Sequence, residues 1–338
     1  MKEDPLTAGG RTIPVVLAID AEPEPGGGTW REPVPWRGFE HWLEYVPRLR
    51  DSLAALSGAP AHFAWFVRCD RQIGDVYGDQ AWAADHYATG FARLKAAGDE
   101  IGIHPHTWRW DTEARHWIHD NANPAWVESV LEAGFERFAA GFGEPALAHR
   151  FGSRFMNAAI ARWLAAHGVR VDTTLEPGSP GLTTLDRNAA FTGTVPDQRS
   201  VPREPYRPDP DDPFRPASTR TLPGELGLWM LPHSAFDPQP LIPRWRQLAR
   251  RVRFFGQQRH RPGQLWTNLD ATGFWDQAVR AAETLPRPYL FLALRSSALI
   301  DVADNVTAKL DALERHPAVR RMRFVTSLEA LDLLIAGE

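Results

Sequence analysis

Short apolar runs alternate with amphipathic stretches along most of the chain. The run 13–19 is almost wholly apolar, and the stretch 39–56 after it carries Trp42, Val46 and Leu49 at helical spacing. Further apolar runs predict strands over residues 61–67, 98–104, 146–151, 169–172, 226–233, 289–294 and 322–325. Helical spacing predicts helices over residues 81–97, 124–142, 156–166, 243–255 and 273–284. This alternation indicates an α/β fold with a parallel sheet and helices outside it, either open or closed into a barrel.

The alternation stops between residues 177 and 227. Pro, Asp, Arg and Thr dominate this segment, no helical period survives in it, and it holds too few apolar residues for a core of its own. We interpret it as a surface excursion before the sixth strand, with a loop that covers the functional site as the alternative. Because strands and helices continue beyond it, the sequence favours a single barrel domain over residues 1–338.

Composition and charge narrow the range of partners. The chain has 338 residues, of which 43% are hydrophobic, so it can bury a large core. Its formal net charge is −4 and its acidic and basic residues are interleaved, which argues against a nucleic acid partner. The run 13–19 is too short for a membrane span or a signal peptide, so we expect a cytoplasmic protein. The single cysteine, Cys69, excludes an internal disulfide and a zinc site built from several cysteines.

Two pairs of candidate functional residues end predicted strands. His104 and His106 stand one residue apart, so on a strand they share a face, and imidazole is a common ligand of transition metals. Asp20 and Glu22 follow the first strand at the same spacing, and carboxylates there can bind a metal or act as a general base. Since the carboxyl ends of parallel strands meet at one edge of a sheet, we expect the two pairs to lie together. The plainer interpretation is a solvated acidic loop and a structural histidine.

Three more polar residues stand at strand ends. Arg150 can orient a carboxylate or hold an oxyanion, and its plainer interpretation is a surface ion pair. His233 is a candidate acid, base or substrate contact. Arg295 runs directly out of an apolar strand, so its guanidinium needs a partner or reaches a cleft.

In their order along the chain these motifs resemble those of the polysaccharide deacetylase superfamily. The apolar strand that ends in Asp20 resembles the family's first motif, and residues 98–104 resemble its Gly-x-Glu-Ile-Gly-x-His motif. Residues 150–153 are similar to the motif whose Arg orients the catalytic Asp. The later motifs resemble residues 160–174, 228–232 and 289–297. The resemblance implies a distorted (β/α)7 barrel, with the 177–227 excursion before its sixth strand.

Three positions depart from the family pattern. Ala21 stands where the family usually places a second Asp, its metal ligand, so Glu22 becomes the candidate ligand. Trp108 stands where the second His is usual, and His106 is a plausible substitute. Arg295 replaces the His that serves as general acid, and a guanidinium can stabilise an oxyanion or bind a substrate anion but cannot donate a proton.

The resemblance implies a hydrolase that removes an acetyl or similar acyl group from a carbohydrate or other small-molecule amide, with a divalent metal, zinc being the expected ion. The implied metal ligands are Glu22, His104 and His106. The implied catalytic residues are Asp20 as base, Arg150 as its orienting group, His233 or water as acid, and Arg295. The alternative hypothesis is a metal-free relative that binds a carbohydrate or an anion. An amidohydrolase-type barrel ranks last, because its His-x-His ends the first strand and here the pair ends the third.

Overall fold

The computed structural model describes residues 11–24, 27–181, 190–192, 194–218, 227–236, 261–262, 271–296 and 299–336. Within these ranges, no helix is both long enough and apolar enough to cross a bilayer. The helix predicted over residues 243–255 lies outside the described residues, as do parts of the 177–227 excursion.

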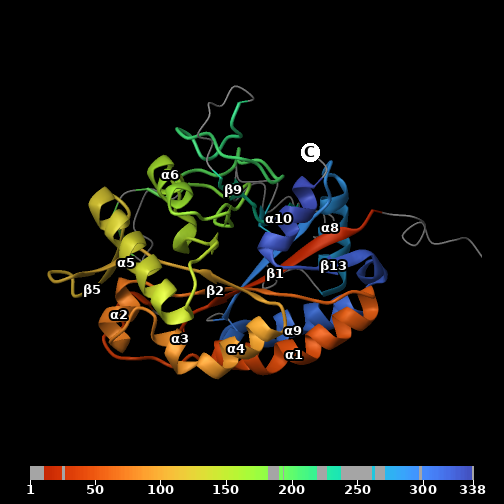
Figure 1. The fold of residues 1–338 in the computed structure, drawn as a ribbon, viewed down its shortest axis with the longest axis horizontal. Helices are drawn as coiled ribbons and strands as arrows, with labels where there is room; N and C mark the ends of the chain where they lie inside the picture. Colours follow the sequence, from red (N-terminus) through yellow and green to blue (C-terminus); the bar gives the residue numbers. More distant parts are fainter. Residues whose placement is uncertain are drawn as a thin grey trace, which may run out of the picture.

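A curved sheet of eight parallel strands is the centre of the described fold (Figure 1). Seven strands follow the order β12-β1-β2-β3-β6-β7-β9, and β13 also pairs with β1. Their bounds are β1 Ile13–Ala21, β2 Ala64–Val67, β3 Glu100–Ile103, β6 Ala148–His149, β7 Val171–Asp172, β9 Trp229–Met230, β12 Leu290–Arg295 and β13 Met322–Phe324. Because every pairing is parallel, the carboxyl ends of these strands lie at one edge. The sheet curls into a half-barrel with helices around it, which confirms the predicted distorted (β/α)7 fold.

Strand β1 is buried on both of its faces, which explains why its sequence is a nearly continuous apolar run. Val15 and Leu17 pack in one hydrophobic cluster with residues of three helices, α1 (Arg37–Ser57), α8 (Ala271–Glu283) and α9 (Leu299–Arg315). Val16 and Ala18, on the opposite face, pack in a second cluster with residues of α10 (Ser327–Ile335). The sheet is therefore a layer between helices on its outer side and α10 on its inner side.

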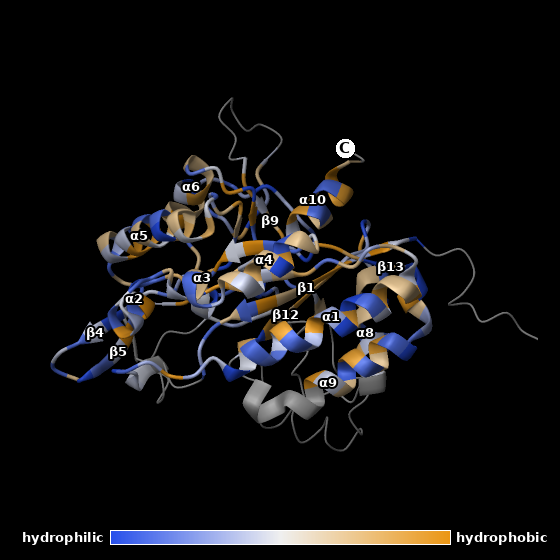
Figure 2. Ribbon diagram, turned by 60° about the horizontal axis from the view of Figure 1, so that its bottom comes forward, coloured by the Kyte–Doolittle hydropathy of each residue, from blue (hydrophilic) through white to orange (hydrophobic). Residues whose placement is uncertain are grey.

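The outer helices match the amphipathic pattern of the sequence. In α1 the buried apolar residues Phe39, Trp42, Val46, Leu49 and Leu53 lie on one face, and Gly58 ends the helix with φ 72°. Polar and apolar faces also separate along α8 and α9 in Figure 2. The remaining helices are α2 Arg71–Tyr77, α3 Trp82–His86, α4 Ala88–Ala96, α5 Pro124–Phe142 and α6 Ala158–Ala166, with short 3-10 turns at Gly27–Thr29, Gly152–Arg154 and Pro317–Arg321.

The prediction of one continuous helix over residues 81–97 is wrong. The structure divides it into α3 and α4 at Tyr87, whose backbone leaves the helical region. The Tyr87 ring packs edge-on against Phe39, and its hydroxyl donates to Glu40 Oε1 at 2.9 Å. These contacts with α1 favour the break at Tyr87, because a continuous helix would move the Tyr87 ring away from Phe39 and Glu40.

A hairpin that the sequence pattern did not predict projects beside the sheet. Strands β4 (Trp108–Asp111) and β5 (His116–Asp120) pair antiparallel, and β8 (Ala190–Thr192) joins β5. A further two-stranded pair consists of β10 (Ala235–Phe236) and β11 (Arg261–Pro262). The hairpin starts directly after the two histidines, so it closes one side of the edge where the strands end.

Glu100 provides a test of how β3 and α10 are joined. Its carboxylate accepts hydrogen bonds from the Ser327 hydroxyl and, at 2.9 Å, from the Leu328 N–H, at the start of α10. Burial nevertheless raises the pKa of Glu100 to about 7. Because the folded protein holds this proton above the pH at which the unfolded chain releases it, stability falls as pH rises between about 4.5 and 7.

We therefore expect Glu100→Gln to remove this pH dependence. Relative to the variant, the wild-type free energy of unfolding should fall by roughly 2–3 kcal/mol across that window, as measured by urea unfolding. Glu44→Gln, which removes an exposed carboxylate of α1, is the control for the loss of one negative charge. A constant difference between wild type and Glu100→Gln across the window would contradict the expectation.

Candidate functional site

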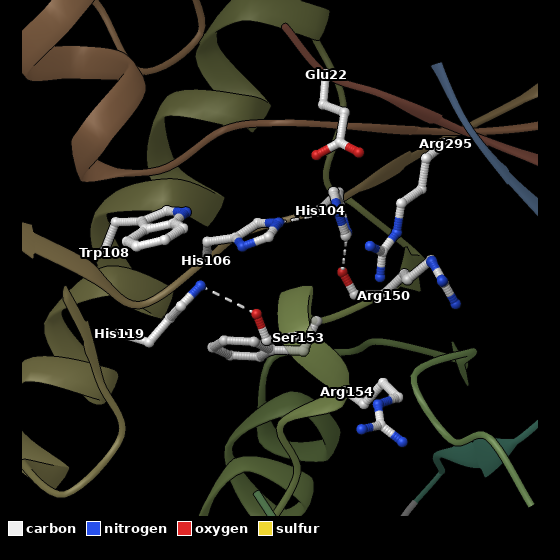
Figure 3. A pocket seen from close by; sticks show the side chains of 10 residues that line it. Glu22, His104, His106, Trp108, His119, Arg150, Ser153, Arg154 and Arg295 are labelled. Atoms are coloured by element: carbon white, nitrogen blue, oxygen red, sulfur yellow. Dashed lines mark hydrogen bonds between the residues drawn. The ribbon is translucent and has the colours of Figure 1, made fainter. Parts of the chain in front are cut away.

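A cavity of about 190 Å³ lies at the carboxyl edge of the sheet (Figure 3). Its walls come from the ends of β1, β3, β6 and β12, from the hairpin, and from the turn after β6. The lining residues are Glu22, His104, His106, Trp108, His119, Arg150, Phe151, Ser153, Arg154 and Arg295. This is the place where an α/β sheet of parallel strands normally binds ligands.

Asp20 and Arg150 form a buried ion pair beside this cavity. Arg150 donates from Nε to Asp20 Oδ1 at 2.7 Å and from Nη1 to the Thr173 carbonyl at 3.0 Å. The second carboxylate oxygen of Asp20 has no hydrogen-bond partner among the described residues. Burial raises the pKa of Asp20, although the charges of Arg150 and Arg295 oppose the shift. Arg150 therefore fixes one oxygen of the carboxylate and leaves the other available.

Glu22, His104 and His106 bring three potential ligand atoms within 4.8 Å of one another. Glu22 is fixed through its backbone, since its N–H donates to Ser296 Oγ at 3.0 Å and its carbonyl accepts from the same hydroxyl at 2.9 Å. The Nε2 atoms of the two histidines are 3.1 Å apart. Figure 3 shows the Glu22 carboxylate directed toward the histidines.

The protonation of His104 follows from its hydrogen bond. Its Nδ1 lies 2.7 Å from the Arg150 carbonyl, which can only accept, so Nδ1 carries the proton and Nε2 presents a lone pair. Burial, together with the charges of Arg150 and Arg68, lowers the pKa of His104 to about 3. A neutral imidazole whose remote nitrogen is held by a carbonyl is the usual form of a metal-binding histidine.

His106 is positioned by its backbone and by a glycine beneath its ring. Its N–H donates to Asp70 Oδ2 at 3.1 Å, and Asp70 is itself held by Arg68 Nε at 2.6 Å. A Cβ atom on Gly152 would lie 2.3 Å from the imidazole ring, so only glycine accommodates this ring position. The strand β3 ends at Ile103, so His106 reaches its position from the segment after the strand and not from a strand face.

The donor set of these three residues fits a divalent metal. Two imidazole nitrogens and one carboxylate are the ligands of many catalytic zinc sites, which keep a further position open for water. Ligand nitrogens on one tetrahedral ion stand about 3.4 Å apart at the usual bond lengths, close to the separation seen here.

His233 lies behind Arg150 and does not line the cavity. The ring is fully buried, its Nε2 contacts Arg150 Nη1, and its Nδ1 is 4.0 Å from Glu176 Oε1. Burial and the Arg150 charge lower the pKa of His233 well below its ordinary value. The neutral ring can therefore support Arg150, but it has no direct path to a molecule in the cavity.

A third cavity histidine, His119, and the nearby Ser153 were missed by the sequence reasoning. His119 Nε2 lies 3.1 Å from Ser153 Oγ, and its ring packs on Trp108 with centroids 3.6 Å apart. Ser153 and Arg154 both have left-handed backbone conformations, with φ 55° and 59°. Such strain in two consecutive non-glycine residues is common where side chains are directed into a functional site. No sequence signal identified His119, because the hairpin that carries it was not predicted.

Six of the seven residues singled out from the sequence gather at the cavity. The residues that line it are Glu22, His104, His106, Arg150 and Arg295. Asp20 does not line the cavity but is hydrogen-bonded to Arg150, which does. His233 is one layer further back. The roles assigned to all seven remain predictions.

The Asp20–Arg150 pair can be tested by its effect on stability. Arg150→Met leaves the Asp20 carboxylate buried without its partner, so the free energy of unfolding should fall by about 3–5 kcal/mol in urea unfolding at neutral pH. The double variant Asp20→Asn, Arg150→Met removes the charge as well and should lose clearly less. A double variant that loses as much as Arg150→Met and Asp20→Asn added together would show that the pair carries no coupling.

No family model matches the sequence, and no curated protein matches it. Comparison with solved structures does find relatives in fold. One is a protein from Parabacteroides distasonis assigned as a glycoside hydrolase/deacetylase, with 15% identity and a TM-score of 0.57, over 98% of this chain and 73% of the other. Another is a protein from Mycobacterium smegmatis assigned as a polysaccharide deacetylase, with 14% identity and a TM-score of 0.51, over 98% and 92% of the two chains. The chain thus has the distorted β/α-barrel fold of these assigned deacetylases.

Proposed function

We propose that this protein is a metal-dependent hydrolase that removes an acetyl or similar acyl group from an amino sugar or a related amide. The observation that carries the proposal is the convergence of Glu22, His104 and His106 beside the buried Asp20–Arg150 pair. The shared fold with assigned deacetylases supports the same class of reaction.

Glu22, His104 and His106 would hold a divalent ion, with zinc as the expected metal. When bound, such an ion polarises a carbonyl and lowers the pKa of a water molecule. The proton transfers would be carried out by side chains of the protein. Asp20 Oδ2, which has no partner among the described residues, is the atom that would accept the proton of the attacking water. Arg150 keeps the carboxylate from rotating away.

The leaving amine needs a proton. His233 is a poor donor because its Nε2 is engaged by Arg150 Nη1, and because burial and the Arg150 charge lower the pKa of His233 and keep the ring neutral. Arg295 cannot donate a proton at neutral pH. Asp20 holds the proton taken from water, so it is the group that can return it to the amine nitrogen as the C–N bond breaks. One carboxylate would thus act first as base and then as acid.

A second candidate function is a metal-free protein that binds a carbohydrate or an anion. The observation in its favour is the 3.1 Å separation of the two Nε2 atoms, because a proton on His106 Nε2 would make a direct hydrogen bond to His104. The site would then be complete without an ion.

Elemental analysis of purified protein separates the two functions. We expect close to one divalent metal per chain after purification in zinc-supplemented buffer, and less than a tenth of that in His104→Ala. Amide hydrolysis should stop on treatment with a strong chelator, and Asp20→Asn should lose at least 100-fold in kcat while it keeps its metal. Full wild-type turnover after complete removal of the metal would contradict the proposal.

Gly152 offers a test that depends on the position of His106. A methyl group at residue 152 must displace the imidazole, so Gly152→Ala should weaken zinc affinity at least tenfold in competition with a fluorescent zinc indicator. Gly227→Ala is the matched control, since a Cβ atom there meets no atom within 4 Å. Equal zinc affinities in the two variants would remove His106 from the proposed ligand set.

A further inference from the structure

Among the charged side chains that line the cavity, positive ones outnumber negative ones. Arg150, Arg154 and Arg295 all line it, whereas Glu22 is the one acidic side chain among its described lining residues. Each of the three arginines has carboxylates near it, and those near Arg295 are Glu22, Glu176 and Asp20. Arg150 binds Asp20 at 2.7 Å, and Arg154 Nε lies 3.6 Å from Glu176 Oε2.

Arg295 is placed at the cavity by the sheet itself. It is the last residue of β12 and the one exposed residue of that strand, which is otherwise buried. Its backbone pairs with Asp20 in the register of β1 and β12, so the two residues are neighbours across adjacent strands. Figure 3 shows its side chain extending into the space beside Glu22 and His104. The rigid strand leaves only side-chain rotation to position the guanidinium.

Arg154 is also held in place by buried groups. Its carbonyl accepts a hydrogen bond from Gln198 Nε2 at 2.8 Å, and Gln198 also accepts the Glu176 N–H at 2.7 Å through its Oε1. Glu176 and Gln198 are themselves buried. Arg154 keeps this position despite its left-handed backbone, with φ 59°. The surrounding network thus presents a second fixed cation to the cavity.

The charges around the cavity do not cancel once the proposed ion is considered. Three carboxylates, from Asp20, Glu22 and Glu176, face three arginines, and a divalent ion held by Glu22 would leave the cavity net positive. Positive charge in a partly enclosed cavity is stabilised by a negative ligand, because fewer water molecules can screen it. Guanidinium groups are well suited to a carboxylate, which they can bind with two parallel hydrogen bonds.

We propose that the substrate of this site is an amide that carries a carboxylate or similar anionic group, which Arg295 and Arg154 bind. The inference rests on the proposed hydrolase function for the amide part of the substrate. It assigns Arg295 to substrate binding, where the sequence left open a choice between oxyanion stabilisation and anion binding.

The test compares two ligands that differ in one charge, N-acetylglycine and its neutral counterpart N-acetylglycinamide. Isothermal titration calorimetry with the zinc-supplemented protein should give at least tenfold tighter binding of N-acetylglycine. Arg295→Gln should reduce that ratio by roughly 10–100-fold, as expected for loss of a charge-assisted hydrogen bond, and Arg154→Gln should reduce it in part. A carboxylate bound to the metal alone would keep its preference in both variants, which would overturn the inference.

Arg320→Gln is the charge-matched control, because Arg320 is exposed on the 3-10 turn Pro317–Arg321, away from the cavity lining. It should keep the wild-type ratio. If Arg295→Gln does not fold, salt titration of the wild type replaces it. Affinity for N-acetylglycine should then fall with NaCl while affinity for the neutral amide stays constant, and an equal salt response of both ligands would contradict the inference.

Activity assays distinguish this inference from the proposed function. If neutral and anionic amides are hydrolysed with equal kcat/KM, the inference fails and the hydrolase proposal stands. If N-acetylglycine binds in an Arg295-dependent manner but no amide is hydrolysed, anion binding stands and the hydrolase proposal fails.

Discussion

Arg150 holds the structure around the cavity together, through both its side chain and its backbone. Its guanidinium binds Asp20 on β1 and the Thr173 carbonyl after β7, while its own carbonyl accepts His104 Nδ1 and its N–H donates to the Ile103 carbonyl at 3.0 Å. Groups from β1, β3 and β7 are thus tied to a single residue after β6. A buried guanidinium is costly unless it is fully paired, and these bonds supply the pairing. The hydrogen bonds that permit the burial of Arg150 also fix the position of Asp20, the candidate base, relative to His104.

The sequence predicted the fold better than the details of its helices. Strands buried on both faces gave unmistakable apolar runs, and α5 was predicted at its observed bounds. Its ends carry strong local signals, since Asn123 accepts the Trp126 N–H at 3.1 Å and Gly143 has φ 75°. The division at Tyr87 depends on contacts with α1, which lie far away in the sequence. The β4–β5 hairpin was not predicted because aromatic and charged residues alternate over only the four residues Trp108–Asp111, and His116–Asp120 shows no such alternation.

The candidate site was predicted in the same uneven manner. Polar residues directly after buried strands were identified, because an apolar run that ends in Asp, His or Arg is visible in the sequence alone. Residues that reach the cavity through turns were not, as the pair His119 and Ser153 illustrates. The position of His106 depends on Gly152, a residue of the next strand-end turn, and only the folded chain brings these two together. His233 lies three residues beyond the end of β9 and not at the strand end, and Arg150 separates it from the cavity.

The bond between Glu22 and Ser296 joins residues 274 positions apart, and Asp20 is 130 positions from Arg150. Contacts of such long range form late, because the loop that they close must first lose its conformational freedom. During synthesis, Glu22 and both histidines therefore emerge long before the strand that fixes Glu22 exists. An incomplete chain holds Glu22 and the two histidines without their mutual geometry, so the candidate site would form only after β12 has arrived. In this protein the first strand reaches its final surroundings only when one of the last strands pairs with it.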